Sequence, residues 1–145
     1  MKKTIYGLAW IVALTGCVTV ISPGKSPMFN VQGGEFEISG KQSDKLDYFV
    51  VLNVKKPDNK TYYLTAGFED PCNHNNEIMS DVTLGSKEKK VLLRSPALDC
   101  VKASRYYRVT VKTYDDQAKT HLVDRLTHKV YSLMDSTKLM LDSGK

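Results

Sequence analysis

Apolar and polar side chains alternate with a period of two along much of the chain. Phe36 and Ile38 alternate with glutamates, and residues 62–68 and 107–111 show the same alternation. Successive side chains on a β-strand point to opposite faces, so each of these stretches predicts a strand with one buried face. Residues 48–54 are almost continuously apolar or aromatic, which is typical of a central strand covered on both faces.

Three shorter or less regular stretches bring the number of predicted strands to about seven. They are residues 78–84, 90–94 and 121–131. Turn-forming residues separate the strands, and residues 56–59 and 114–117 are predicted to be hairpin-like connections. No stretch before Ser132 shows a sustained helical period. This pattern predicts an all-β fold, in which an antiparallel β-sandwich is favoured over a closed barrel.

The C-terminal tail, residues 132–145, carries five large apolar side chains: Leu133, Met134, Leu139, Met140 and Leu141. Asp135 or Ser136 could cap a short helix here, and an extra strand is the alternative. We expect the tail to close one end of the core. A segment that docks on a partner is the other interpretation, because Met-rich surfaces adapt to different partners.

The N-terminus has the layout of an export signal. Lys2 and Lys3 precede an uncharged apolar run over residues 4–15, and small residues lead to Cys17. An uncleaved transmembrane anchor is the alternative, because the apolar run over residues 5–21 is close to the length that spans a bilayer.

The four residues Leu14-Thr15-Gly16-Cys17 resemble the lipobox of bacterial lipoproteins. The resemblance implies cleavage before Cys17 and attachment of acyl chains, palmitate among them, to Cys17. Several buried acyl chains make a stable membrane anchor, whereas one chain is marginal. Val18 stands where enteric bacteria place an aspartate to retain a lipoprotein in the inner membrane. The resemblance therefore implies the outer membrane, with the protein facing the periplasm or exposed at the surface.

This interpretation divides the chain into a signal peptide (1–16), a lipid anchor and tether (17–34) and a sandwich domain (35–145). A chain of 145 residues that is 41% hydrophobic and 26% charged has the composition of one globular domain. Removal of the signal takes two lysines away, so the formal net charge falls from +5 to +3. Such a small surplus spread along the chain gives no reason to expect a nucleic-acid partner.

The remaining cysteines, Cys72 and Cys100, are predicted to form a disulfide, because an even pair in an exported domain is usually oxidised. His74 lies close to Cys72, which raises a metal site or a Cys–His nucleophilic pair as alternatives. Neither is favoured, since no short paired ligand spacing is present and a nucleophile needs a free thiol. We expect no metal and no cofactor.

Leu98 and the run Tyr107-Arg108-Val109-Thr110-Val111 resemble the corner between strands E and F of fibronectin type III and immunoglobulin-like domains. This resemblance implies an immunoglobulin-like sandwich in which the tyrosine hydroxyl pins the preceding loop. The buried tryptophan familiar in such domains has no counterpart, because Trp10 in the predicted signal is the only Trp.

The best candidate binding surface is the outward face of the strand that contains Tyr107. Aromatic and basic side chains of this kind are enriched at binding hot spots. A solvated face, or one covered by a neighbouring strand, is the alternative. The candidate strip consists of Tyr106, Arg108, Thr110, Lys112 and Tyr114. The second basic cluster, formed by Lys87, Lys89 and Lys90, is interpreted as protection of an exposed sheet edge.

The motifs of serine hydrolases, P-loop proteins and dinucleotide-binding proteins are absent from the sequence, and we expect no catalytic residues. The predicted function is that of a non-enzymatic, lipid-anchored binding or scaffolding subunit at the outer membrane. It would be accessory to a secretion, conjugation or similar envelope complex, with the membrane and an envelope protein as partners. The alternative is an inhibitor or surface-recognition module that binds a host or environmental protein or glycan, using the Asn-rich loop after Cys72.

Overall fold

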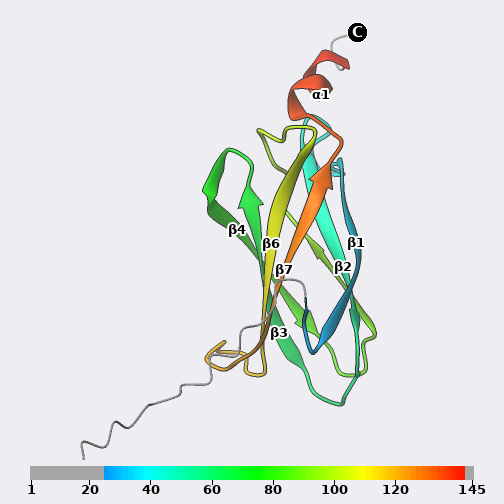
Figure 1. Cartoon of the computed structure of the whole chain (residues 1–145), viewed down its shortest axis with the longest axis vertical. Helices are drawn as coiled ribbons and strands as arrows, with labels where there is room; N and C mark the ends of the chain where they lie inside the picture. The colour runs from blue at the N-terminus through cyan, green and yellow to red at the C-terminus, as the bar shows by residue number, and fades with distance from the viewer. Residues whose placement is uncertain (1–24, 143–145) are drawn as a thin grey trace, which may run out of the picture.

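A computed structural model describes residues 25–142 of the chain. Seven strands form two facing sheets, and one short helix follows them (Figure 1). The elements are β1 (Phe29–Ile38), β2 (Leu46–Val54), β3 (Tyr62–Asp70), β4 (Asn73–Leu84), β5 (Lys90–Arg94), β6 (Arg105–Tyr114), β7 (Leu122–Ser132) and α1 (Ser136–Asp142). The predicted signal and residues 17–24 of the predicted tether, Cys17 included, lie outside the described residues.

The two sheets have the strand orders β1-β2-β5 and β4-β3-β6-β7, and all neighbouring strands are antiparallel. The predicted immunoglobulin-like β-sandwich is therefore confirmed. In Figure 1, α1 lies at the upper end of the sandwich, and the turns that follow β2, β4 and β6 lie at its lower end. These two ends are called the upper end and the lower end below.

One of the two predicted hairpins is wrong. Residues 56–59 carry the chain from β2 in the three-stranded sheet to β3 in the four-stranded sheet, so the strands that they join are not paired. Turn-forming residues indicate where the chain reverses, but they do not determine which sheet the next strand enters. Residues 114–117 do belong to the connection between the paired strands β6 and β7, as predicted.

The core lies between the sheets and is centred on aromatic side chains from both of them. Phe36 stacks on Tyr48 with ring centroids 4.5 Å apart, and Tyr48 meets the edge of Phe68 at 5.1 Å. Tyr48, Phe68 and Tyr107 are fully buried. Burial of one large apolar side chain contributes about 1.5–3 kcal/mol, so this cluster contributes strongly to the attraction between the sheets.

The domain begins earlier in the chain than residue 35, the predicted boundary. Phe29 already starts β1 and is buried, so residues 29–34 belong to the sandwich and not to the tether. The predicted tether ended at Gly34, whereas β1 passes through Gly33 and Gly34 with a register shift. Gly34 lies so close to the carbonyl oxygen of Phe49 that a Cβ would clash, which explains a glycine inside a strand.

The predicted disulfide is present in the structure. Cys72 and Cys100 are bonded, with their Cα atoms 5.1 Å apart. The bond joins the β3–β4 turn to the connection between β5 and β6. The thiol of Cys72 is therefore consumed, and the alternative of a Cys–His nucleophilic pair is wrong.

The predicted tyrosine corner also forms. The hydroxyl oxygen of Tyr107 accepts a hydrogen bond from the backbone N–H of Lys102 at 2.8 Å. This contact fixes the loop before β6 to the buried side chain of Tyr107 on that strand, as in immunoglobulin-like domains.

The tail forms a short helix, which was one of its two predicted structures. Asp135 caps it, because its Oδ1 atom accepts a hydrogen bond from the N–H of Thr137 at 2.9 Å. Met134 and Leu139 pack against the core, so the tail closes the upper end of the sandwich as expected. Within residues 25–142, no helix has the length and apolar character needed to cross a bilayer.

Candidate binding surface

The candidate strip lies on β6, which is an inner strand between β3 and β7. Its members differ in accessibility. Tyr106 is 61% exposed and Arg108 is exposed, whereas Lys112 and Tyr114 are half-buried and Thr110 is only 5% exposed. Thr110 is a small side chain between two long ones on a central strand, so it is not available to a partner. The exposed part of the strip is therefore its upper end.

An exposed aromatic pair occupies this upper end. Tyr106 is in register with Tyr131 on β7, and their ring centroids are 4.9 Å apart. Tyr131 is 42% exposed, and Leu133, which follows two positions later, is 81% exposed. Exposed aromatic side chains of this kind supply large contact areas at interfaces. Tyr131 and Leu133 were not among the predicted site residues, although the alternation that buries Val130 predicts an outward Tyr131.

Two cations accompany the aromatic pair. Arg108 is in register with Lys129 on β7, so both lie on the outward face one row from the tyrosines. The nearest carboxylate to the Arg108 side chain is Glu77 on β4, at 3.9 Å, which is too long for a strong ion pair. We call the five residues Tyr106, Arg108, Lys129, Tyr131 and Leu133 the upper patch.

A buried carboxylate supports the upper patch from below. Glu69 is 8% exposed, and its Oε2 atom accepts a hydrogen bond from the backbone N–H of Arg108 at 2.8 Å. Its Oε1 atom lies 2.9 Å from Nδ1 of His74 and 3.9 Å from the guanidinium of Arg105. A buried carboxylate needs such partners, because desolvation of an unpaired charge is costly. Glu69 was not among the predicted site residues.

The Asn-rich segment after Cys72 begins a strand. Residues 73–76 open β4, and Asp70 on β3 pairs with Asn73. The inhibitor alternative placed its contact in this segment, and residues 73–76 are exposed where the register between β3 and β4 shifts. Within residues 25–142 there is also no group of three or more His, Cys, Asp or Glu side chains placed to hold a metal ion.

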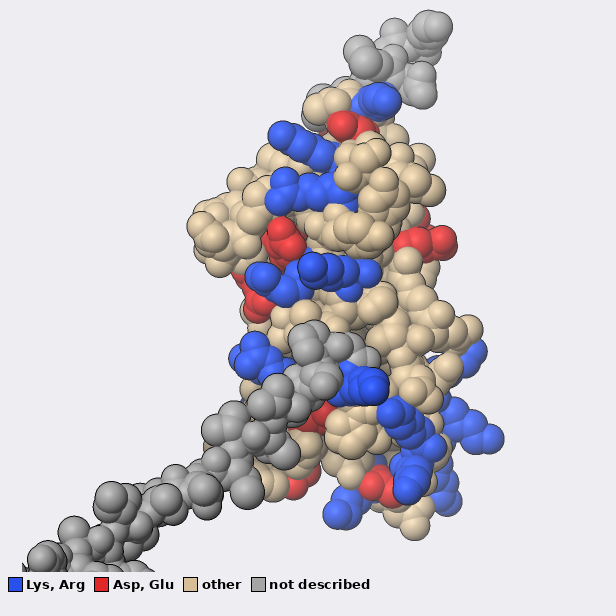
Figure 2. All heavy atoms as spheres, viewed as in Figure 1, with Lys and Arg blue, Asp and Glu red and all other residues tan. Residues whose placement is uncertain are grey.

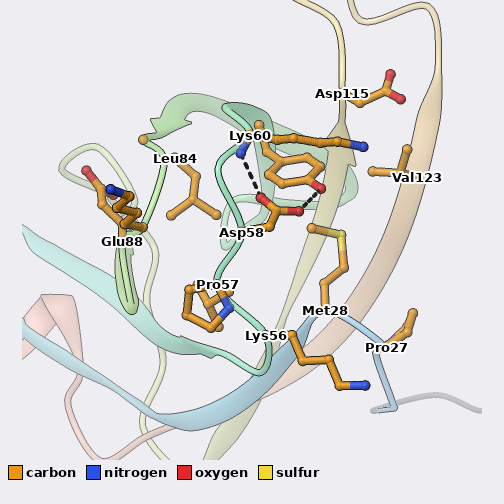
Figure 3. Close-up of a pocket in the computed structure, with 14 residues that line it drawn as sticks. Pro27, Met28, Lys56, Pro57, Asp58, Lys60, Leu84, Glu88, Asp115 and Val123 are labelled. Carbon is orange, nitrogen blue, oxygen red and sulfur yellow. Dashed lines mark hydrogen bonds between the residues drawn. The ribbon is translucent and has the colours of Figure 1, made fainter.

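A cavity of about 210 Å³ lies at the lower end, far along the strands from the upper patch (Figure 3). Asp58 projects beside it and accepts hydrogen bonds from the Tyr62 hydroxyl at 2.7 Å and from the N–H of Lys60 at 2.9 Å. The Tyr62 hydrogen bond is the largest cause that lowers the pKa of Asp58, and the same bond raises the pKa of Tyr62. Met28, Val54 and Leu84 supply apolar walls.

Lys87, Lys89 and Lys90 lie at the start of β5 and in the turn before it. Because β5 is an edge strand of the three-stranded sheet, these lysines stand where the sequence interpretation placed them, beside an exposed edge.

Comparisons with known proteins identify no family. No protein-family model matches the chain, and no curated protein matches it. Among solved structures, a calcium-binding mutant of Bacteroides uniformis β-glucuronidase 2 is similar, with 16% sequence identity and a TM-score of 0.42. The match covers 67% of this chain and 13% of that protein, so the chain spans a small part of the other protein's length.

Proposed function

We propose that this protein is a non-enzymatic, lipid-anchored subunit that binds or scaffolds other proteins at the outer membrane. It would be accessory to a secretion, conjugation or similar envelope complex. The lipobox-like residues 14–17 support the anchor, and the upper patch supports the binding role. The upper patch carries the proposal, because it is the exposed surface whose composition matches a protein-binding site.

The chemistry of the upper patch indicates what kind of partner it fits. Tyr106 and Tyr131 expose two aromatic rings, and Arg108 and Lys129 add positive charge beside them. Tyrosine and arginine are the residue types that most often dominate binding energy at interfaces. A partner surface with an apolar centre and acidic residues around it would be complementary to this arrangement.

The position of the upper patch suits a membrane-anchored subunit. The N-terminal segment joins the domain at the lower end, because Ser26 is hydrogen-bonded to Asp124 near the start of β7. The patch lies at the other end of β6 and β7. Seven residue steps along β7 separate Asp124 from Tyr131, and a strand rises about 3.3 Å per residue, so the patch would be held roughly 23 Å from the point where the tether joins.

The anchor is tested by fractionation. Cys17→Ser removes the predicted site of lipid attachment, so the variant should move from the membrane fraction to the soluble fraction. A variant that still sediments with membranes, at the level of the unchanged chain, would contradict the lipid anchor.

The binding role is tested by site-specific photo-crosslinking in cells that express the full chain. A photoreactive residue in place of Tyr106 should give a crosslink to a defined envelope protein. The same residue in place of Leu92, which is 48% exposed on the other sheet, is the matched control. Arg108→Glu should abolish the Tyr106 crosslink, because it reverses a charge in the patch. Equal crosslinking from both positions, or none from Tyr106, would contradict the proposal.

A further inference from the structure

Lysines from four separate parts of the sequence meet at the lower end of the sandwich. They come from the segment before β1 and from the connections that follow β2, β4 and β6. Figure 2 shows basic side chains gathered at this end of the domain. The members of this lysine end are Lys25, Lys55, Lys56, Lys60, Lys87, Lys89, Lys90 and Lys119.

The acidic side chains near the lysine end are engaged in holding turns. Asp58 accepts the hydrogen bonds from Tyr62 and Lys60 described above. Asp116 accepts backbone hydrogen bonds from Thr120 and His121, and Asp115 contacts the His121 ring at 2.8 Å. Asp81 pairs with Lys119, Asp124 accepts a hydrogen bond from Ser26, and Glu88 is the remaining acid at this end of the described residues. These six carboxylates keep their charge, but they are two fewer than the eight lysines, so a positive surplus remains at this end.

Most of the lysines are left without an ionic partner. Lys119 pairs with Asp81 at 2.7 Å, and Nζ of Lys55 donates a hydrogen bond to the carbonyl oxygen of Ser26. Among residues 25–142, the other six lysines form no ion pair within 4.0 Å, and all six are exposed: Lys25, Lys56, Lys60, Lys87, Lys89 and Lys90. The result is a surface of free ammonium groups.

The upper end has no such surplus. Its connections hold lysines that are matched by aspartates, and one of these pairs, Lys45–Asp99, is in contact at 3.2 Å. The lysines there are Lys41, Lys45, Lys102 and Lys138, and the aspartates are Asp44, Asp70, Asp99 and Asp135. The positive surplus of the molecule is thus concentrated at one end.

The lysine end is also where the N-terminal segment is fastened. The Ser26 hydroxyl donates a hydrogen bond to the Asp124 carboxylate and accepts hydrogen bonds from the N–H groups of Met28 and Phe29 at 3.1 and 3.0 Å. Nine residue steps separate Cys17 from Ser26, and an extended chain of that length spans at most about 30 Å. A lipid on Cys17 would keep the lysine end close to the bilayer.

We propose that the lysine end is a docking surface for a lipid leaflet that contains anionic headgroups. The inference rests on the anchoring part of the proposed function and adds the orientation of the domain. Each lysine near an anionic membrane strengthens association roughly fivefold. Salt limits the range of this attraction to about 10 Å. Lys56, Lys60 and Lys87 line the cavity in Figure 3, which gives a headgroup space between the ammonium groups and the apolar wall.

The test uses the full acylated chain, purified from membranes and reconstituted into vesicles. One set contains phosphatidylcholine alone, and the other contains phosphatidylcholine with phosphatidylglycerol. A water-soluble amine reagent labels the lysines, and peptide mass spectrometry gives the labelling of each one. In the anionic vesicles, labelling of Lys56, Lys60 and Lys87 should fall at least about fivefold. High salt should restore it, and the labelling of Lys41 and Lys102 should not change.

Charge reversal supplies a matched comparison. A triple variant with Lys56→Glu, Lys60→Glu and Lys87→Glu should lose the protection of the neighbouring Lys89 in anionic vesicles. The control variant Lys41→Glu, Lys102→Glu, Lys138→Glu changes the net charge equally and should keep that protection. Equal labelling of both ends of the molecule in both vesicle types would overturn the proposal.

Flotation of the same samples separates this proposal from the anchor. Flotation with neutral vesicles in high salt shows the anchor alone. If the protein floats in this way but anionic vesicles at low salt give no protection of the lysines, only the lysine surface is overturned. If the protein floats only with anionic vesicles, and high salt abolishes this flotation, the result supports the lysine surface and contradicts the anchor. Flotation with neither vesicle type overturns both.

Discussion

The disulfide between Cys72 and Cys100 makes a quantitative prediction possible. The bond closes a loop with a sequence separation of 28 residues. In the chain-entropy model, such a loop restricts the unfolded chain enough to raise the free energy of unfolding by about 3.6 kcal/mol. Both half-cystines are exposed, so their replacement by serine removes little buried apolar surface. The double variant Cys72→Ser, Cys100→Ser should therefore lose about 3.6 kcal/mol, nearly all of it through the unfolded state.

Equilibrium unfolding in urea, followed by far-UV circular dichroism, measures this loss. The unchanged chain under a strong reductant is the control, and it should match the double variant. The dependence of the free energy on urea concentration should also become steeper, because an uncrosslinked unfolded chain exposes more surface. A loss below about 1 kcal/mol, with both forms unfolding in one cooperative step, would refute the entropic argument.

Three further substitutions test interactions inside the domain. Tyr107→Phe should lower the free energy of unfolding by about 1–3 kcal/mol, because the N–H of Lys102 loses its acceptor. Glu69→Ala should lower the free energy of unfolding by about 1.5–3 kcal/mol, because the N–H of Arg108 loses a charged acceptor. Urea unfolding measures the effect of both substitutions. Burial lowers the pKa of His128 below 6.5, so the unfolded chain binds more protons than the folded chain just below that pH. The free energy of unfolding should fall as the pH drops through 6.5 towards the folded pKa, and His128→Gln should flatten this part of its pH profile.

Each of these predictions has an outcome that contradicts it. An unchanged urea midpoint for Tyr107→Phe would mean that the corner contact contributes nothing to stability. For Glu69, the variant Glu69→Gln keeps an acceptor and should lose less than Glu69→Ala, so the reverse order would contradict the network. If the pH profile of His128→Gln is parallel to that of the unchanged chain, the shifted pKa has no effect on folding.

The features that the sequence predicted well are those in which the deciding residues are close together. Alternation locates β3 and β6 because it reports one strand at a time. The tyrosine corner is predictable because only five residues separate Tyr107 from Lys102. The cysteine pair is predictable because oxidation depends on compartment and on the number of cysteines, without reference to the fold.

The features that the sequence did not predict depend on contacts between distant segments. Glu69 is buried because the backbone of Arg108, 39 residues away, lies beside it in the sheet. Gly33 and Gly34 lie within β1, and only their pairing with β2 distinguishes them from a linker. The lysines at the lower end come from four parts of the sequence, and the alternation of strand direction brings them together. No local pattern contains that information.

The order of strands in the four-stranded sheet has a consequence for synthesis. β6 fills the space between β3 and β7, yet it is made long after β3. While the ribosome is still producing β5, the buried side chains of β3, such as Leu64 and Phe68, lack the β6 and β7 half of their sheet. A chain that stops after β5 is therefore not a smaller sandwich but a fragment with an open apolar face and an unpaired strand edge, and such fragments aggregate.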